Sequence, residues 1–356
     1  MRQALDLAAR GEGHVEPNPM VGCVLVVADR PVGQGYHAAF GGPHAEVTAI
    51  REAGERSRGA TAYVTLEPCC HHGKTPPCTA ALIQSGVTRV VIANEDPFPQ
   101  VAGGGVAQLR AAGIQVDIGL LSDASRPLNA PYLKRVRTGR PWMIAKWAMT
   151  LDGKVATAGG DSRWISSERS RQIVHQLRGR MDGIMIGRGT AAADDPLLTA
   201  RPAGPRTATR IVVDSQAQLS IDSQLVQTSG QAPTLIASGP AAEQDAVDRL
   251  TEAGCEIIRG VSDDSDDRLD ELLVELGRRS MTNILVEGGP RLLASLIRAG
   301  QIDEVHVFLA PKLLGGGRAV SEGPGLAAVS DALDLVETRV EHHAGDTYWC
   351  GRIRDR

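Results

Sequence analysis

The chain contains the sequence TLEPCCHHGKTPPC at residues 65–78, and HAE precedes it at residues 44–46. Zinc deaminases use three protein ligands, a water in the fourth position and a carboxylate beside that water. A helix that starts at His44 places a ligand and a carboxylate in one turn, and a helix start also favours the thiolate form of cysteine. We therefore predict that His44, Cys69 and Cys78 bind zinc. Glu46 is the predicted general base, which takes a proton from the water and returns it to the ring nitrogen and the leaving ammonia.

Two features leave alternatives open at this stage. A structural zinc site needs four protein ligands, and Cys70, His71 or His72 could supply the fourth, although Glu46 would then have no role. Eight residues separate Cys69 from Cys78, whereas the common deaminase signature has two between its cysteines. The spacing is therefore a poor match to ordinary cytidine deaminases.

The length of the chain indicates how many domains surround this motif. A chain of 356 residues is expected to form two domains. The polar, basic stretch at residues 126–140 is the predicted boundary, giving domains at residues 1–140 and 141–356. In both parts, apolar runs typical of buried strands alternate with helical patterns, which predicts largely parallel sheets covered by helices.

Charge and aromatic content argue against a nucleic-acid-binding protein. The formal net charge is −4, whereas a protein that binds nucleic acid through its phosphates needs a basic face. Aromatic residues make up only 3% of the chain, whereas a surface on which bases stack needs aromatic side chains. No run of about 18 apolar residues could span a membrane, and residues 1–10 do not resemble a signal peptide. We expect a cytoplasmic protein whose six cysteines stay reduced.

The second domain has a glycine-rich segment, GRGTAA at residues 187–192, after an apolar strand. Asp214 ends the next strand, so the residue types and their spacing match the Rossmann fingerprint. That fold needs a long helix after the glycines, but only residues 190–194 can be helical before Pro196. The sequence therefore argues against a Rossmann domain.

Several motifs together resemble the bifunctional riboflavin-biosynthesis deaminase/reductase family over nearly the whole chain. They are PNPMVG at residues 17–22, GPHAE at 42–46, the zinc motif at 65–78, KWAMTLDGK at 146–154 and VEGGP at 286–290. The resemblance implies a cytidine-deaminase-like αβα domain followed by a dihydrofolate-reductase-like α/β domain. It also implies Zn²⁺ and NADPH as cofactors, pyrimidine ribosyl phosphates as substrates, and a homo-oligomer, either a dimer or a tetramer.

The expected reactions are deamination of 2,5-diamino-6-ribosylamino-4(3H)-pyrimidinone 5′-phosphate and then reduction of its ribosylamino group to ribitylamino. Two alternatives stay open: a protein in which only the reductase half works, or a non-catalytic zinc-stabilised module that binds nucleotide or RNA. Phe98 and Gly104 depart from the family pattern, in which Asn and often Lys stand, so substrate contacts there are in doubt.

The resemblance also assigns site residues. In the deaminase, the residues expected to contact substrate are Asn18, His71 and Lys74. In the reductase, the residues expected to contact NADPH are Ala148, Trp164, Thr190, Asp194, Ser215 and Gly289. Those expected to contact the reductase substrate are Ser162, Arg178, Leu198, Arg201 and Glu287. Lys146 and Glu287 are the candidates for handling protons during hydride transfer to C1′ of the opened ribose. The Gly288-Gly289 turn before a helix suits the phosphates of NADPH.

Overall fold

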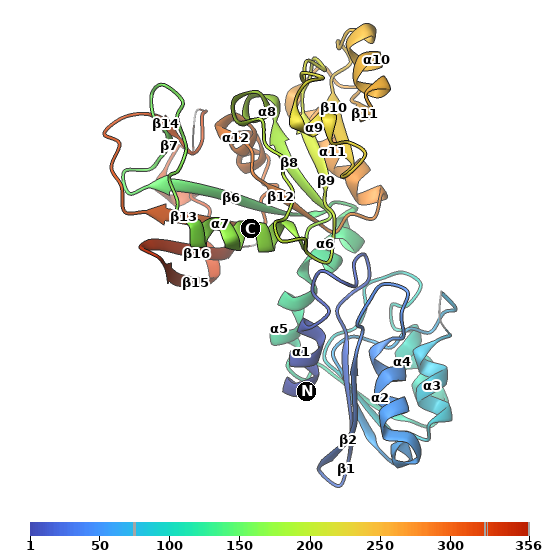
Figure 1. Ribbon diagram of the computed structural model, residues 1–356. Coiled ribbons are helices and arrows are strands. Elements are labelled where there is room, and N and C mark those ends of the chain that lie inside the picture. Colours follow the sequence, from blue (N-terminus) through green and yellow to red (C-terminus); the bar gives the residue numbers. More distant parts are fainter. Residues whose placement is uncertain (74–75, 324, 326, 355–356) are drawn as a thin grey trace. The chain divides into compact units, whose positions relative to one another are not determined.

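The computed structural model describes residues 1–73, 76–323, 325 and 327–354. The chain divides into two compact units, Met1–Gly139 and Arg140–Arg356 (Figure 1). Each unit has hydrophobic cores of its own. In the described part of the chain, no helix is long and apolar enough to cross a membrane. Lys74, which we expected at the deaminase site, lies outside the described residues.

The first unit is built on a five-stranded sheet in the order β2-β1-β3-β4-β5. Its strands are β1 (Gly22–Val27), β2 (Arg30–Tyr36), β3 (Thr61–Val64), β4 (Arg89–Ile92) and β5 (Gln115–Ile118). β3, β4 and β5 are parallel, but β1 is antiparallel to both of its neighbours. The sheet is therefore mixed, and the expectation of a largely parallel sheet was wrong for this half. The cause is a tight hairpin in which Ala28 and Asp29 both adopt positive φ.

Helices cover both faces of this sheet. The helices are α1 (Arg2–Ala9), α2 (Ala45–Ala53), α3 (Cys78–Gln84), α4 (Gly104–Ala111), α5 (Ser122–Ser125) and α6 (Ala130–Thr138), with 3-10 turns at Gly54–Ser57 and Arg126–Asn129. The main core packs α2, α3 and α4 against one face, and α1 packs separately on β1. α2 lies directly on β2, because a Cβ at Gly35 would lie 2.5 Å from the carbonyl oxygen of Ala45. The result is the expected αβα layering.

The second unit contains a nine-stranded sheet in the order β11-β10-β9-β8-β12-β6-β13-β16-β15. Its strands are β6 (Trp142–Thr150), β8 (Gly183–Gly187), β9 (Thr209–Val213), β10 (Thr234–Ser238), β11 (Glu256–Arg259), β12 (Asn283–Val286), β13 (Glu304–Ala310), β15 (Leu335–His343) and β16 (Asp346–Ile353). The seven strands from β11 to β13 are parallel, and only the β13-β16-β15 edge is antiparallel. β7 (Lys154–Ala156) and β14 (Arg318–Ala319) form a separate small sheet.

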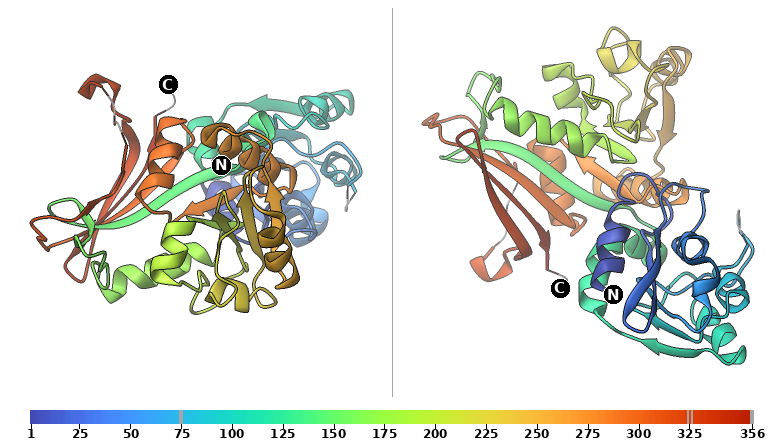
Figure 2. Two further views of the ribbon diagram at one scale, coloured as in Figure 1. Left: turned by 90° about the horizontal axis from the view of Figure 1, so that it is seen from above. Right: turned by 60° about the horizontal axis from the view of Figure 1, so that its bottom comes forward.

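Two cores lie on opposite faces of this sheet. The helices are α7 (Glu168–Arg178), α8 (Arg188–Asp194), α9 (Gln224–Gln227), α10 (Gln244–Glu252), α11 (Ser265–Arg278) and α12 (Pro290–Arg298), with a 3-10 turn at Val329–Asp331. α7, α8, α9 and α10 pack in one core, and α11 and α12 in the other; Figure 2 shows the same unit from two further sides. α8 has only seven residues, as the argument against a Rossmann domain requires. Because neighbouring strands are parallel, their carboxyl ends share one edge of the sheet, where ligands bind in open α/β sheets.

Candidate active sites

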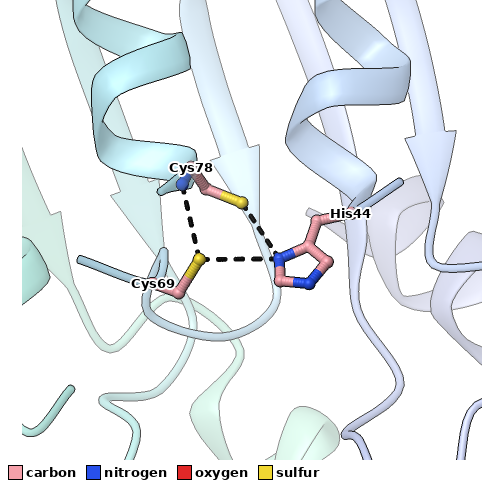
Figure 3. A group of neighbouring side chains, drawn as sticks. All are labelled: His44, Cys69 and Cys78. Carbon is pink, nitrogen blue, oxygen red and sulfur yellow. Dashed lines mark hydrogen bonds between the residues drawn. The ribbon is translucent and has the colours of Figure 1, made fainter. Parts of the chain in front are cut away.

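The predicted zinc ligands meet in the first unit. His44 caps the start of α2, Cys78 is the first residue of α3, and Cys69 comes from the loop after β3. The Nδ1 atom of His44 lies 3.1 Å from the Sγ of Cys78 and 3.5 Å from the Sγ of Cys69, as Figure 3 shows. All three ligand atoms lie within 4.8 Å of one another. Residues from three separate segments therefore point their donor atoms at one position.

The donor set fits zinc with an open coordination position. Imidazole and thiolate are ligands that Zn²⁺ prefers, and three protein ligands are typical of a catalytic rather than a structural site. Among the described residues, the cluster contains no fourth His, Cys or carboxylate ligand. Cys70 lies near the carbonyl oxygen of Gln100, at 3.5 Å, and His72 is exposed. These positions favour the catalytic interpretation over the structural one.

The two cysteines differ in how readily they lose a proton. Hydrogen bonds with Cys78 and His44 lower the pKa of the Cys69 thiol, and the backbone N–H of Cys78 donates to its Sγ at 3.3 Å. The hydrogen bond with Cys69, together with burial, raises the pKa of Cys78. The two thiols therefore differ in acidity although their sulfur atoms belong to one cluster. A metal that takes both sulfurs as thiolates requires both thiols to lose their protons.

Glu46 lies in the first turn of α2 and is only 3% exposed. Burial and the nearby Cys69 raise the pKa of its carboxyl group to about 7. The carboxyl group also interacts with the thiol of Cys78, so it lies beside the ligand cluster. A group with a pKa near neutrality can both accept and release a proton, as a general acid–base catalyst must.

His37 is a site residue that the sequence analysis missed. Its Nδ1 lies 3.1 Å from the carbonyl oxygen of Pro43, and its Nε2 lies 3.3 Å from the Nδ2 of Asn18. A carbonyl only accepts, so Nδ1 carries the proton; burial lowers the pKa of His37 and keeps the ring neutral. Nε2 then accepts from the Asn18 amide, which leaves the Asn18 Oδ1 oriented as an acceptor. The ring also contacts His44 edge-on, with centroids 5.1 Å apart.

The residues that depart from the family pattern lie near this site. Phe98 packs with Leu66 and Tyr132 in a small cluster, and its ring centroid is 6.2 Å from that of His71. The buried Nδ1 of His71 has no hydrogen-bond partner among the described residues. A Cβ at Gly104 would lie 2.9 Å from the Cys70 Sγ, so the α4 start packs closely on this loop. Phe98 therefore supports the position of His71.

The second unit contains a cavity of about 2220 Å³ at the carboxyl ends of the parallel strands. It brings together all the residues predicted for the reductase. Those that line it are Lys146, Ala148, Ser162, Trp164, Arg178, Thr190, Asp194, Leu198, Arg201, Ser215, Glu287 and Gly289. These residues come from segments up to 143 positions apart in the chain (146 to 289), and the fold alone gathers them.

A buried ion-pair network lies in this cavity. Glu287 accepts from the Nε of Arg178 at 2.6 Å and from the Nζ of Lys146 at 3.4 Å. Burial raises the pKa of Glu287, but the two cations outweigh it and hold the pKa at about 2. Glu287 therefore carries no proton to donate at neutral pH, and it fits a role in orienting the two cations better than the predicted role in proton transfer.

Two further features shape the cavity. Gly289 immediately precedes α12, and a Cβ there would lie 2.9 Å from the Oγ1 of Thr190, so the turn leaves room only for backbone N–H groups. Trp164 is 62% exposed, and the guanidinium of Arg171 stacks over its ring at 4.4 Å. Arg171 also lines the cavity and was not predicted from the sequence.

Comparisons with known proteins find matches to both units of the chain. Residues 1–94 match the cytidine and deoxycytidylate deaminase zinc-binding region, and residues 141–347 match the RibD C-terminal domain. The riboflavin biosynthesis protein RibD of Aquifex aeolicus is 40% identical over 97% of this chain and 95% of that protein. The Escherichia coli RibD is 41% identical over 97% of this chain and 96% of that protein.

Solved structures extend the likeness to the whole fold. A structure of Acinetobacter baumannii RibD superimposes with a TM-score of 0.88 at 35% identity, covering 99% of this chain and 98% of the other. A Thermotoga maritima protein described as a diaminohydroxyphosphoribosylaminopyrimidine deaminase/5-amino-6-(5-phosphoribosylamino)uracil reductase has a TM-score of 0.85 at 35% identity, covering 99% of this chain and 97% of that one. With its zinc-ligand cluster and its cavity each in its own unit, the chain belongs to the RibD family of bifunctional deaminase/reductases of riboflavin biosynthesis.

Proposed function

We propose that residues 1–140 deaminate 2,5-diamino-6-ribosylamino-4(3H)-pyrimidinone 5′-phosphate and that residues 141–356 reduce the product's ribosylamino group with NADPH. The His44, Cys69 and Cys78 cluster beside the buried Glu46 is the observation that carries the proposal. The cavity lined by every predicted reductase residue supports its second half. The Thermotoga maritima relative bears the names of both activities.

In the deaminase, His44, Cys69 and Cys78 hold the zinc, which supplies the Lewis acidity that makes water a nucleophile at neutral pH. Glu46 accepts a proton from the attacking water and delivers it to the ring nitrogen. It then assists the departure of the 2-amino group as ammonia, so that water and the amine are exchanged for a carbonyl and NH₃. Asn18, oriented by His37, accepts a hydrogen bond from the substrate through its Oδ1. His71 and Lys74 contact the substrate.

In the reductase, NADPH supplies the hydride, and the chain positions the two reactants. The cofactor contacts Ala148, Trp164, Thr190, Asp194, Ser215 and Gly289. The substrate phosphate contacts Ser162, Arg178, Leu198 and Arg201, where a planar guanidinium suits a dianion. Reduction would place the hydride of the cofactor at C1′ of the opened ribose and a proton on the attached nitrogen. Lys146 is the proposed proton donor, and Glu287 orients its Nζ.

Glu46→Gln tests the proposal. The amide keeps the shape of the side chain but cannot take the proton, so ammonia release is expected to fall by at least about 10²-fold. Zinc content, measured by atomic absorption, is expected to stay at one per chain. NADPH oxidation with the deaminated substrate is expected to stay normal. Glu55→Gln, at an exposed site just after the same helix, is the matched control.

Other results would be decisive in the opposite direction. Undiminished ammonia release from Glu46→Gln would overturn the base assignment. A wild-type protein that oxidises NADPH with the deaminated substrate but releases no ammonia would be a reductase with an inactive deaminase. RNA affinity that falls steeply with salt, without either activity, would favour a binding module.

We also propose that the protein works in the cytoplasm as a homo-oligomer. The six cysteines are all free, which fits a reducing compartment. Val340 and Trp349 pair across β15 and β16 and are more than 40% exposed, which fits a surface that another copy covers. Light scattering of the purified protein would show a single species larger than 37.6 kDa; a monomer would contradict the oligomer.

A further inference from the structure

The reductase cavity extends beyond the residues that the family resemblance assigns. Four of the predicted cofactor contacts follow the order of the strands: Ala148 on β6, Gly289 after β12, Thr190 after β8 and Ser215 after β9. A dinucleotide with its nicotinamide at β6 and its pyrophosphate at Gly289 must extend its adenosine half over β8 and β9. The cavity continues in that direction, to Ser238, Arg259 and Gly260 at the ends of β10 and β11.

Arg268 stands at this far end. It lies in the first turn of α11, and its Nη2 donates to the Oγ of Ser215 at 3.5 Å. Its Nη1 donates to the carbonyl oxygens of Ser262 and Asp263, at 2.9 and 2.6 Å. No carboxylate among the described residues forms an ion pair with it. The charge of Arg268 helps to lower the pKa of the nearby Asp264 carboxyl group, but the guanidinium itself lies beside a hydroxyl group in the cavity wall.

Glycines bring this cation close to the ends of the strands. A Cβ at Gly239, after β10, would lie 3.5 Å from the Arg268 Nε, and one at Gly260, after β11, would lie 3.0 Å from its Cδ. The Gly239 N–H in turn donates to the carbonyl oxygen of Ser215 at 2.9 Å. The hydroxyl and the guanidinium are thus held against each other by the backbone of three neighbouring segments.

The acidic residue directly after β9 is held by contacts within the protein. Asp214, which would hydrogen-bond a ribose 2′-hydroxyl in a Rossmann domain, is only 1% exposed here. Its Oδ2 accepts from the N–H of Leu219 at 2.7 Å, so the carboxylate holds the loop after β9. Its Oδ1 lies 3.8 Å from the Nε of Arg188, so the charge of this carboxylate is paired within the protein although the residue lines the cavity.

From these positions we infer that Arg268 and Ser215 bind the 2′-phosphate of NADPH and select it over NADH. The inference rests on the proposed function, because it needs a nicotinamide dinucleotide in this cavity. A guanidinium with a hydroxyl beside it matches a phosphate dianion, whereas the uncharged 2′-hydroxyl of NADH gains little from either. Arg268 is a specificity-determining residue remote from the hydride and takes no part in its transfer.

The test compares cofactor binding in the full-length protein without substrate. Dissociation constants for NADPH and NADH are measured from nicotinamide fluorescence, for wild type, Arg268→Gln, Arg268→Lys and Arg169→Gln. Arg169 is an exposed arginine on α7 outside the cavity, so its change removes the same charge elsewhere. Displacement by 2′,5′-ADP and by 5′-AMP isolates the contribution of the 2′-phosphate.

Arg268→Gln is expected to weaken the binding of NADPH by about 10- to 100-fold, which is the loss of affinity typical of a charge-assisted hydrogen bond. NADH affinity is expected to change by less than about threefold, and 2′,5′-ADP to lose its advantage over 5′-AMP. Arg268→Lys should recover part of the selectivity, and Arg169→Gln should match wild type.

Four results would overturn the inference. An equal loss of affinity for NADPH and NADH in Arg268→Gln would show that Arg268 only supports the loop at residues 262–263. Unchanged NADPH affinity in Arg268→Gln would place the 2′-phosphate elsewhere. A wild-type protein that binds both dinucleotides equally would show no selection, whereas one that binds neither would remove the proposed reductase as well.

Discussion

Glu46 and Glu287 are both buried glutamates, yet their surroundings move their pKa values in opposite directions. Burial and Cys69 raise the pKa of Glu46 to about 7, whereas Arg178 and Lys146 outweigh burial and hold that of Glu287 at about 2. The first can exchange protons near neutral pH, and the second remains a carboxylate. The difference separates a proton-transfer role from an orienting role.

The low pKa of Glu287 predicts how the stability of the second unit depends on pH. A carboxyl group whose pKa is lower in the folded state stabilises the fold above its ordinary value of 4.5, and that contribution is lost as pH falls towards 2. The loss is expected to reach about 3 kcal/mol at the acidic end. Urea unfolding followed by tryptophan fluorescence measures it, because all four tryptophans, at positions 142, 147, 164 and 349, belong to this unit.

Glu287→Gln provides the comparison for this measurement. The amide cannot titrate, so the variant is expected to be less stable at neutral pH and to show a shallower decline between pH 5 and pH 3. Equal slopes in the two proteins would contradict the assignment of the low pKa to Glu287.

Among the elements, β9 carries an arginine whose side chain joins several segments around the cavity. Arg210 is fully buried, and it donates to the Oγ1 atoms of Thr228 and Thr234, both within 2.7 Å. It also donates to carbonyl oxygens of Leu225, Ala232 and Leu197. Leu197 lines the cavity, so Arg210 connects the cavity loop, α9 and the start of β10.

Arg210→Lys is expected to destabilise the second unit by about 2–4 kcal/mol. An ammonium group keeps the charge but lacks the planar fork of donors, so several buried carbonyl and hydroxyl groups lose their partner. Tryptophan-detected urea unfolding gives the change. Arg249→Lys, at an exposed position on α10, is the control and should stay within about 0.5 kcal/mol of wild type. A similar stability for both variants would rule out the joining role of Arg210.

The sequence predicted some elements well and missed others for physical reasons. Residues 21–27 are an apolar run that predicts a buried strand, and they contain β1. Residues 77–85 have a helical pattern with a proline at the start, and they contain α3. β2 was not predicted, because RPVGQGY has a proline and two glycines where a strand pattern has branched residues. Because those glycines have no side chain, α2, which carries Glu46, can pack directly on β2. β15 was missed because its polar side chains hide the alternation.

The residues of the two sites also divide into those that the sequence predicts and those that it does not. Zinc ligands were predictable, since the donor types and a helix start are local signals. His37 and Arg268 were not, because each acts through a partner far along the chain: Asn18 for the first and Ser215, 53 positions earlier, for the second. Such pairs form only when the sheet packs, and a single stretch of sequence does not indicate which distant residues will meet.

At the scale of the whole molecule, each unit holds one of the two proposed sites. The zinc-ligand cluster, Glu46, His37 and Asn18 lie within Met1–Gly139. Every residue that lines the reductase cavity lies within Arg140–Arg356. Each unit also has hydrophobic cores of its own. The two chemistries are therefore expected to be separable in the intact protein.

Removal of zinc tests this separation. A chelator such as dipicolinate is expected to reduce ammonia release by at least about 10²-fold, because the water loses its Lewis acid. NADPH oxidation with the deaminated substrate should stay within about twofold of the untreated rate, since no residue of the cavity belongs to the zinc cluster. Added Zn²⁺ should restore deamination in the wild type but not in Cys69→Ala, which lacks a ligand. If chelation also stopped NADPH oxidation, the second unit would depend on the metal of the first, and the two sets of groups would not be independent catalysts.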